Sequence, residues 1–199
     1  GQVGAAMLGT DAFQEVDVVG ITQPITKWNY QIRRAEDIAW AVSRAFYIAS
    51  SGRPGPVVLD FTKNAQTAMI DYEPKNIDFI RSYNPVPTPA EGSVEKAARM
   101  INDSVKPFML VGQGVELADA RDELLALCEK AQIPFGTTFL GLSAAPSDHP
   151  LNMGKLGMHG NLAPNVMTNQ CDLLIAVGMR FDDRVTGNLK NYAKQARII

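Results

Sequence analysis

The chain has 199 residues, a formal net charge of −2, 46% hydrophobic residues and 20% charged residues. This composition is typical of a globular protein with one large domain or two small ones. It provides neither a basic field for nucleic acid nor a polybasic patch for a membrane surface, so we expect neither partner. No apolar run approaches the ~18 residues that cross a bilayer, and the first residues do not resemble a secretory signal.

Histidine and cysteine are too few and too scattered to predict a metal site. The chain has two of each, and their spacing matches no metal-ligand pattern. Cys128 and Cys171 lie in helix-like patterns with apolar neighbours. This setting favours two buried free thiols over a disulfide.

The first part of the chain predicts a helix, a turn and a buried strand. Residues 35–51 place apolar side chains on one face at 3.6-residue spacing, namely Ile38, Val42, Ala45, Phe46 and Ala49. Gly52 ends this helix, a Pro-Gly-Pro turn follows, and residues 57–59 have the pattern of a buried strand. Residues 17–27 fit either a short strand or a loop.

A proline-rich segment separates this part from the next one. Four prolines (Pro74, Pro85, Pro87 and Pro89) lie among mostly polar residues, which predicts an extended interdomain linker over residues 67–90. The alternative is a long surface loop within one domain, although a structureless loop of this length is uncommon in a compact domain.

The second part alternates helices and strands. Ser93 is a candidate cap for a helix with Val94, Ala97, Ala98 and Ile101 on its inner face. A second helix is predicted over residues 117–130 with inward Leu117, Leu124, Leu127 and Cys128, and a third over residues 162–171. Strands are predicted at 107–111, 133–139, 173–177 and from 197, with a long loop reaching Gly160. This alternation predicts an α/β fold with a doubly wound, Rossmann-like parallel sheet.

Glycine and charged residues follow the predicted strands, where such a sheet binds its ligands. The apolar run 173–177 is followed by Gly178 and the charged stretch to Thr186, and a Gly-Gln-Gly turn follows residue 111. Residues 137–139 and the loop 156–160, which contains His159, fall at the same edge. Alone, each has a simpler explanation. The charged stretch after Gly178 fits a solvated loop, the Gly-Gln-Gly segment fits a tight turn, and His159 fits a structural histidine. Together they predict a nucleotide cleft, and no Ser-His-Asp or Cys-His arrangement competes with it.

Four motifs in order carry a resemblance to a known family. They are Gly9-Thr-Asp-Ala-Phe-Gln-Glu15, Gly52-Arg-Pro-Gly-Pro-Val57, Gly157-Met-His-Gly160 and Gly178-Met-Arg-Phe-Asp-Asp-Arg-Val-Thr-Gly187. The chain resembles the catalytic large subunit of acetohydroxyacid synthase, also called acetolactate synthase, a thiamine-diphosphate enzyme. The resemblance implies that residues 1–66 are the C-terminal half of a pyrimidine-binding domain, 67–90 a linker, and 91–199 most of a middle, FAD-binding domain.

The resemblance also implies roles for individual residues. Phe13 and Gln14 match positions at the thiamine site, Lys63 matches a lysine at the substrate channel, and these three are the implied catalytic residues. Met158 and Asp183 match positions that border the substrate channel. Gly4 stands where relatives commonly have proline. The implied FAD-binding residues are Arg53, Gly112, Gln113, Gly114, Thr138, Phe139, Leu140, Leu156, Gly157, Met158, His159, Gly178, Arg180, Asp182, Arg184 and Val185.

The family's activity is the condensation of pyruvate with pyruvate or 2-oxobutyrate, which starts branched-chain amino acid synthesis. The resemblance implies a homodimer, a possible small regulatory subunit, and a cytoplasmic location in bacteria or an organellar one in eukaryotes. The activating glutamate is expected before Gly1, and the domain that binds the diphosphate and Mg²⁺ after Ile199. We therefore expect an internal fragment that is inactive alone. The alternatives are another thiamine-diphosphate carboligase or oxidase, or a noncatalytic nucleotide-binding module.

Overall fold

The computed structural model describes residues 2–199 of the chain. It forms two compact units, Gly1–Thr88 (unit 1) and Pro89–Ile199 (unit 2). No helix among the described residues is both long and apolar enough to cross a bilayer.

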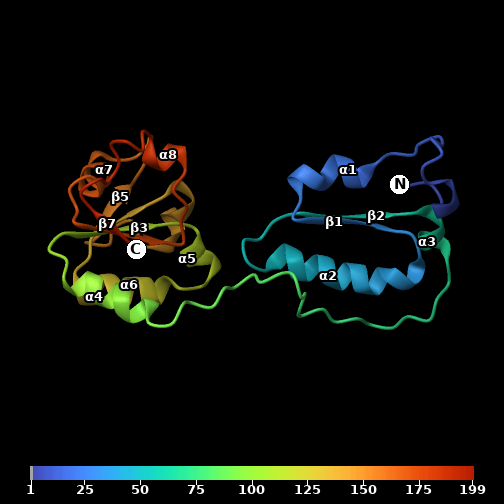
Figure 1. Ribbon diagram of the computed structural model, residues 1–199, viewed down its shortest axis with the longest axis horizontal. Coiled ribbons are helices and arrows are strands. Elements are labelled where there is room, and N and C mark those ends of the chain that lie inside the picture. Colours follow the sequence, from blue (N-terminus) through green and yellow to red (C-terminus); the bar gives the residue numbers. More distant parts are fainter. Residues whose placement is uncertain (1) are drawn as a thin grey trace. The chain divides into compact units, whose positions relative to one another are not determined.

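Unit 1 is built on a two-stranded parallel sheet (Figure 1). Strand β1 (Trp28–Ile32) pairs with β2 (Val57–Phe61), and helices α1 (Val18–Thr22) and α2 (Ile38–Ser50) cover opposite faces of the pair. The remaining elements are η1 (Ala5–Met7), η2 (Gln23–Ile25), η3 (Ala35–Asp37) and α3 (Lys63–Thr67). The small core consists of Ile32, Ala41 and Ala65, with aromatic side chains packed around it.

Unit 2 contains a five-stranded parallel sheet with the order β5-β4-β3-β6-β7. Its strands are β3 (Pro107–Val111), β4 (Phe135–Thr137), β5 (Asn152–Lys155), β6 (Leu173–Val177) and β7 (Arg197–Ile198). Its helices are α4 (Ser93–Asn102), α5 (Gly114–Leu117), α6 (Arg121–Ala131), η4 (Phe139–Ala144), α7 (Leu162–Thr168) and α8 (Asp183–Thr186). The predicted α/β class and the parallel sheet are confirmed.

Helices cover both faces of this sheet because successive residues of β3 point in opposite directions. Met109 and Val111 face one core with α4 and α6, whereas Phe108 and Leu110 face a second core with α7. Each predicted thiol lies in one of these cores, Cys128 in the first and Cys171 in the second, and both are free. Burial raises the pKa of each thiol to about 11.

Several predicted elements differ in detail, and the first differences lie in unit 1. Residues 18–22 are helical because the Asp17 carboxylate accepts a hydrogen bond from Gly20 N at 2.9 Å and caps the turn. In α2 the buried residues are Ala41, Ala45 and Ile48, so Phe46 points to solvent with 73% of its surface exposed. Strand β1 was missed although its apolar residues Trp28, Tyr30 and Ile32 alternate with polar ones, which is the pattern of a strand with one apolar face.

In unit 2, the helix predicted at 117–130 is broken. Asp119 has a φ of 52°, which ends α5 and leaves α6 to start at Arg121. Consequently Leu117 and Leu127 are partly exposed rather than inward. Helix α4 is preceded by Gly92 with a φ of 72°, and Ser93 is its first residue and not its cap.

Three further strand and helix assignments in unit 2 were incomplete. Val94, predicted on the inner face of α4, is 68% exposed. Strand β4 is shorter than predicted and ends at Thr137, where a 3-10 turn begins. The predicted long loop contains β5, which pairs with β4 through an irregular register.

The proline-rich segment lacks regular secondary structure but part of it lies on α2. Ile77 N donates a hydrogen bond to Ser43 Oγ at 2.9 Å, and the Tyr83 ring meets the Tyr47 ring at a centroid distance of 6.1 Å. The Lys27 ammonium donates to Ile48 O and Ser51 O at the end of α2, and to the Tyr83 hydroxyl. The boundary between the units, after Thr88, falls within the predicted linker.

Candidate functional site

The candidate cofactor site in unit 2 lies where the strand order reverses. The chain runs from β3 outward through β4 to β5, and then returns to place β6 on the other side of β3. The carboxyl ends of β3 and β6 therefore mark the point where the strand order reverses, which is the usual ligand position in a doubly wound sheet. All predicted FAD-contacting segments of unit 2 follow β3, β4, β5 or β6 at this edge.

The loops after β3 and β6 cross with their backbones in direct contact. Gly112 N donates to Val177 O at 2.9 Å, and Gly114 N donates to Gly178 O at 2.8 Å. A Cβ atom at Gly112 would lie 2.3 Å from Gly178 O, and one at Gly114 would lie 2.6 Å from Gly178 Cα. The Gly-Gln-Gly turn is therefore required for loop-to-loop packing, whether or not a ligand also approaches it.

The loop after β5 is joined to the segment after β6. Met158 N donates to Arg184 O at 2.8 Å, and a Cβ atom at Gly157 would lie 2.8 Å from the same oxygen. The Asn165 side chain of α7 accepts from Gly157 N at 2.9 Å and donates to Gly157 O at 3.0 Å. Leu156 is buried, whereas Met158 and His159 are exposed at the edge.

The loop after β4 adds apolar surface at this edge. Thr138 N donates to Val111 O at 2.8 Å, and the Thr138 hydroxyl accepts from Gly141 N at 3.1 Å, which starts η4. Phe139 and Leu140 are 70% and 56% exposed. The Lys155 ammonium lies 5.5 Å from the centroid of the Phe139 ring. Exposed apolar side chains on an ordered turn are suited to contact with a planar aromatic ligand.

The segment after β6 supplies positive charge and free backbone donors. Arg180 and Arg184 have about three quarters of their side chains exposed and are only loosely paired, at 3.4 Å to Asp182 and 3.9 Å to Asp183. The N–H groups of residues 179–181 donate no hydrogen bond to any residue from 2 to 199. Guanidinium groups beside free amides are a suitable arrangement for a phosphate or diphosphate.

The two aspartates of this segment have different surroundings. The Asp182 carboxylate accepts from Arg184 N at 2.9 Å and caps α8, which fixes the turn that carries both arginines. Asp183 is 83% exposed in its side chain and is free to meet a ligand. Val185 is partly buried and packs on the core under the loop. Asp182 therefore shapes the segment that carries both arginines.

In unit 1, Phe13 and Gln14 lie on a turn at the carboxyl end of the sheet. Phe13 is 90% exposed, and Gln14 has a φ of 65°. Lys63 begins α3 directly after β2, and its N–H donates to Val3 O at 3.3 Å, at the base of the same loop. The structure thus brings the three predicted catalytic residues to one end of unit 1.

Arg53 lies at the opposite end of β2 from Lys63, in the turn that enters the strand. It is exposed and has no ion-pair partner among the described residues. Gly4 has φ −63° and ψ 147°, and nothing lies within 4 Å of an added Cβ. The backbone at this position is therefore already in the conformation that proline would impose.

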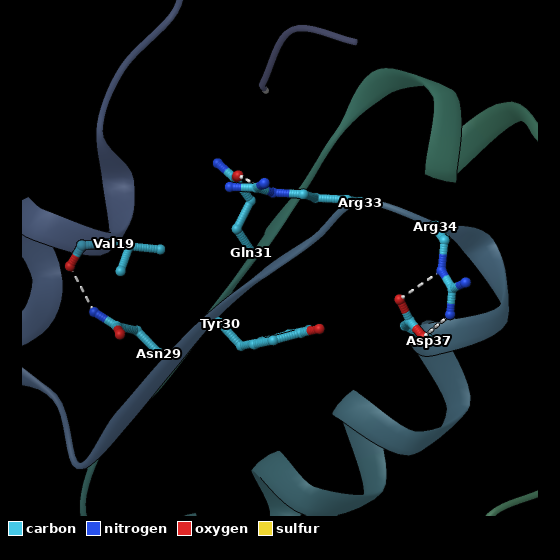
Figure 2. A pocket seen from close by; sticks show the side chains of 7 residues that line it. All are labelled: Val19, Asn29, Tyr30, Gln31, Arg33, Arg34 and Asp37. Carbon is cyan, nitrogen blue, oxygen red and sulfur yellow. Dashed lines mark hydrogen bonds and ion pairs between the residues drawn. The ribbon is translucent and has the colours of Figure 1, made fainter. Parts of the chain in front are cut away.

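A hollow of about 660 Å³ in unit 1 was not predicted (Figure 2). It runs along β1 and is lined by Val19, Asn29, Tyr30, Gln31, Arg33, Arg34 and Asp37. Figure 2 shows Asn29 donating to Val19 O on one side of the strand and the Arg34–Asp37 ion pair at its far end. The Arg34 guanidinium lowers the pKa of the Asp37 carboxyl. The hollow was not predicted because strand β1, along which it runs, was not predicted.

No three His, Cys, Asp or Glu side chains among residues 2–199 are arranged to hold a metal ion. The edge of unit 2 instead offers apolar surface, two guanidinium groups and free amides. The loop of unit 1 offers the exposed Phe13 ring and the side-chain amide of Gln14.

The comparisons with known proteins agree with the motifs. The chain is 46% identical over its full length to the acetolactate synthase large subunit of Corynebacterium glutamicum, covering 32% of that protein. It is equally similar, at 46%, to the isozyme 1 large subunit of Escherichia coli, covering 35% of it. The chain thus spans about a third of the length of these curated relatives. The resemblance to acetolactate synthase inferred from the motifs is confirmed.

A solved structure and a family model extend this result. A protein from Mycobacterium smegmatis, assigned as a thiamin diphosphate-dependent enzyme, superposes with a TM-score of 0.76 and 26% identity, covering all of this chain and 38% of its own. Residues 94–199 match the model of the central domain of thiamine pyrophosphate enzymes. The chain therefore belongs to the thiamine pyrophosphate enzyme family, and its unit 2 carries that family's central domain.

Proposed function

We propose that this chain forms part of an acetolactate synthase catalytic subunit. The observation that carries the proposal is 46% identity over the whole chain to large subunits of that enzyme, which includes the loops at both candidate sites. The whole enzyme would join pyruvate to a second pyruvate or to 2-oxobutyrate with loss of carbon dioxide. Thiamine diphosphate, when bound, supplies the stabilised carbanion that this reaction needs.

In this proposal the residues of unit 1 position the reacting groups. The Phe13 ring offers an apolar surface that excludes water, and the Gln14 amide donates a hydrogen bond without adding a charge. Lys63 contributes a positive charge at the carboxyl end of β2, close to the same loop, which suits a carboxylate substrate. Met158 and Asp183, at the edge of unit 2, are proposed to border the substrate channel.

We propose that the edge of unit 2 holds FAD in a structural role. The exposed Phe139 and Leu140 fit contact with its ring system, and Arg180 and Arg184 fit its diphosphate. Arg53, on unit 1, is proposed to reach the same cofactor. The remaining proposed contacts are backbone groups and side chains of Gly112, Gln113, Gly114, Thr138, Leu156, Gly157, Met158, His159, Gly178, Asp182 and Val185.

The assembly is proposed by analogy with the relatives. Their names identify a large subunit, which supports a small regulatory subunit as partner, and we expect catalytic homodimers in the cytoplasm of a bacterial cell. Mg²⁺ would bind with the diphosphate outside the 199 residues. The chain alone is therefore proposed to be inactive.

An assay on pyruvate tests the function. The full-length protein that carries this sequence is expected to form acetolactate when thiamine diphosphate, Mg²⁺ and FAD are supplied, and the isolated 199-residue chain is expected to form none. A full-length protein that consumes pyruvate without forming acetolactate would indicate a different thiamine-dependent reaction. Acetolactate formation by the isolated chain would refute its proposed inactivity.

A further inference from the structure

The loop that carries Phe13 and Gln14 is fixed at its base by a buried polar network. The Gln2 side chain, only 6% exposed, donates to Val16 O at 2.7 Å and to the Asp60 carboxylate of β2 at 3.1 Å. Asn64 accepts from Ala5 N at 2.7 Å. These contacts tie both ends of the segment 3–16 to the end of β2. They leave the tip, residues 9–15, without support from the sheet.

The tip folds around the carboxylate of Glu15. Glu15 accepts hydrogen bonds from Gly9 N with one oxygen and from Ala12 N, at 3.1 Å, with the other, while Glu15 N donates to Ala12 O at 2.9 Å. The side chain is partly buried inside its own turn. The two amide donors, with Gly9 contributing most, lower the pKa of the Glu15 carboxyl.

The backbone of the tip adopts conformations that need such support. Asp11 and Gln14 have φ values of 59° and 65°, although neither is glycine, and side chains other than glycine rarely adopt such conformations. The turn nevertheless holds Phe13 out with 90% of its surface exposed. An exposed aromatic ring on a backbone that is locally unfavourable is typical of a preorganised functional loop.

We propose that Glu15 is a positioning residue whose carboxylate holds the loop 9–15 in the conformation that presents Phe13 and Gln14 to the substrate. The inference rests on the proposed function, in which these two residues meet the reacting groups. Glu15 itself points into the loop and does not touch the substrate. A glutamine in its place has one acceptor atom, and its amide group would oppose the second N–H.

The test compares Glu15→Gln with the wild-type full-length protein, using Glu91→Gln as the control because Glu91 is exposed and lies far along the chain in unit 2. We expect acetolactate to form about tenfold to hundredfold more slowly in Glu15→Gln, with a larger fraction of pyruvate released as acetaldehyde. The melting temperature and the control should remain near wild type. A purely structural role would lower the amount of folded enzyme without changing the product ratio, and this result would overturn the proposal, as would wild-type kinetics.

A second measurement does not depend on activity. Amide hydrogen exchange at Gly9 and Ala12 should be about tenfold faster in Glu15→Gln than in wild type, because each amide loses a charged acceptor. Equal exchange rates would overturn the inference even in an active enzyme. If the wild-type protein forms no acetolactate, the proposed function fails, and exchange still decides whether Glu15 holds the loop.

Discussion

The two candidate sites hold their loops by different means. In unit 2, the loops after β3 and β6 cross backbone against backbone, and the absence of side chains at Gly112, Gly114 and Gly178 makes the crossing possible. In unit 1, the loop 3–16 is held by polar side chains, chiefly Gln2 at its base and Glu15 at its tip. The loops at the edge of the five-stranded sheet are thus held chiefly by backbone contacts with one another, whereas the loop of the two-stranded unit is held chiefly by hydrogen bonds of its side chains.

Breaking the backbone crossing in unit 2 should have the largest effect. An alanine at Gly112 places its Cβ 2.3 Å from Gly178 O, and neither loop can move without disturbing a core strand. Gly112→Ala should therefore lower the free energy of unfolding of unit 2 by about 3 kcal/mol. Urea titration followed by circular dichroism measures this loss. Both tryptophans, Trp28 and Trp40, lie in unit 1, so their fluorescence serves as an internal reference.

A matched control for this substitution is Gly92→Ala, also in unit 2. Gly92 is in the left-handed conformation with a φ of 72° and a ψ of 1°, but nothing lies within 4 Å of an added Cβ. It should cost only the left-handed backbone penalty, about 1 kcal/mol. Equal losses at the two positions would show that the close crossing does not contribute to stability.

Unit 2 also contains side-chain hydrogen bonds that join distant segments, so the two ways of holding a loop can be compared within one unit. The Asp172 carboxylate, before β6, accepts from the Ser104 hydroxyl, from Val105 N at 2.7 Å and from Lys106 N at 2.9 Å. Asp172→Ala should lower the free energy of unfolding by about 2 kcal/mol at neutral pH, because three donors lose a charged acceptor. Equilibrium unfolding in urea at pH 7 measures it.

The hydrogen bonds of Asp172 also predict a pH dependence. The Ser104 hydroxyl and the two amides hold the pKa of the Asp172 carboxyl at about 2, below its ordinary value near 4 in the unfolded chain. Its stabilisation is therefore complete above pH ~4 and lost as the pH falls toward about 2. The difference between wild type and Asp172→Ala should shrink over this interval. A difference that stays constant from pH 5 to pH 2 would contradict this account.

The exposed charges at the edge of unit 2 should affect binding more than stability. Arg180→Ala should weaken FAD binding to the chain about tenfold, the value of one charge-assisted bond to a phosphate. Arg197→Ala removes the same charge near the opposite end of the sheet, because Arg197 begins β7, and should leave binding unchanged. Flavin fluorescence quenching measures both. Equal affinities of the two variants would remove Arg180 from the site.

The smallest expected effect is at Gly4, in the loop of unit 1. Its φ of −63° and ψ of 147° suit proline, and an added side chain meets no atom within 4 Å. Gly4→Pro should raise the free energy of unfolding by about 0.5–1 kcal/mol through a less flexible unfolded chain. Tryptophan fluorescence in a urea titration measures this gain. A loss of stability would indicate that the loop depends on a mobile residue at this position.

The two units also differ in how much of their structure could be predicted from the sequence. Strands β3 and β6 were predicted with their observed bounds because both are continuous apolar runs. Their topology then placed the four loops at one edge without any further information. The packing role of Gly112 was not predicted, because it depends on its contact with Gly178, which lies far away in the sequence.

The structure of unit 1 was predicted less completely. Strand β1 was missed although its apolar and polar residues alternate as in a half-buried strand, and residues 18–22, predicted as a strand or loop, form a helix capped by Asp17. The conformation of the loop tip depends on where the Glu15 carboxylate lies relative to two amides, which no periodicity reveals. Only the resemblance indicated that Phe13 and Gln14 are functional residues.

The most direct test of the proposed flavin site is a titration of the folded 199-residue chain with FAD. We expect saturable quenching of flavin fluorescence that excess NAD does not reverse, because the edge of unit 2 combines exposed apolar side chains with Arg180 and Arg184. A folded chain that binds no FAD, or one from which NAD displaces it, would contradict the assignment of this edge as a flavin site.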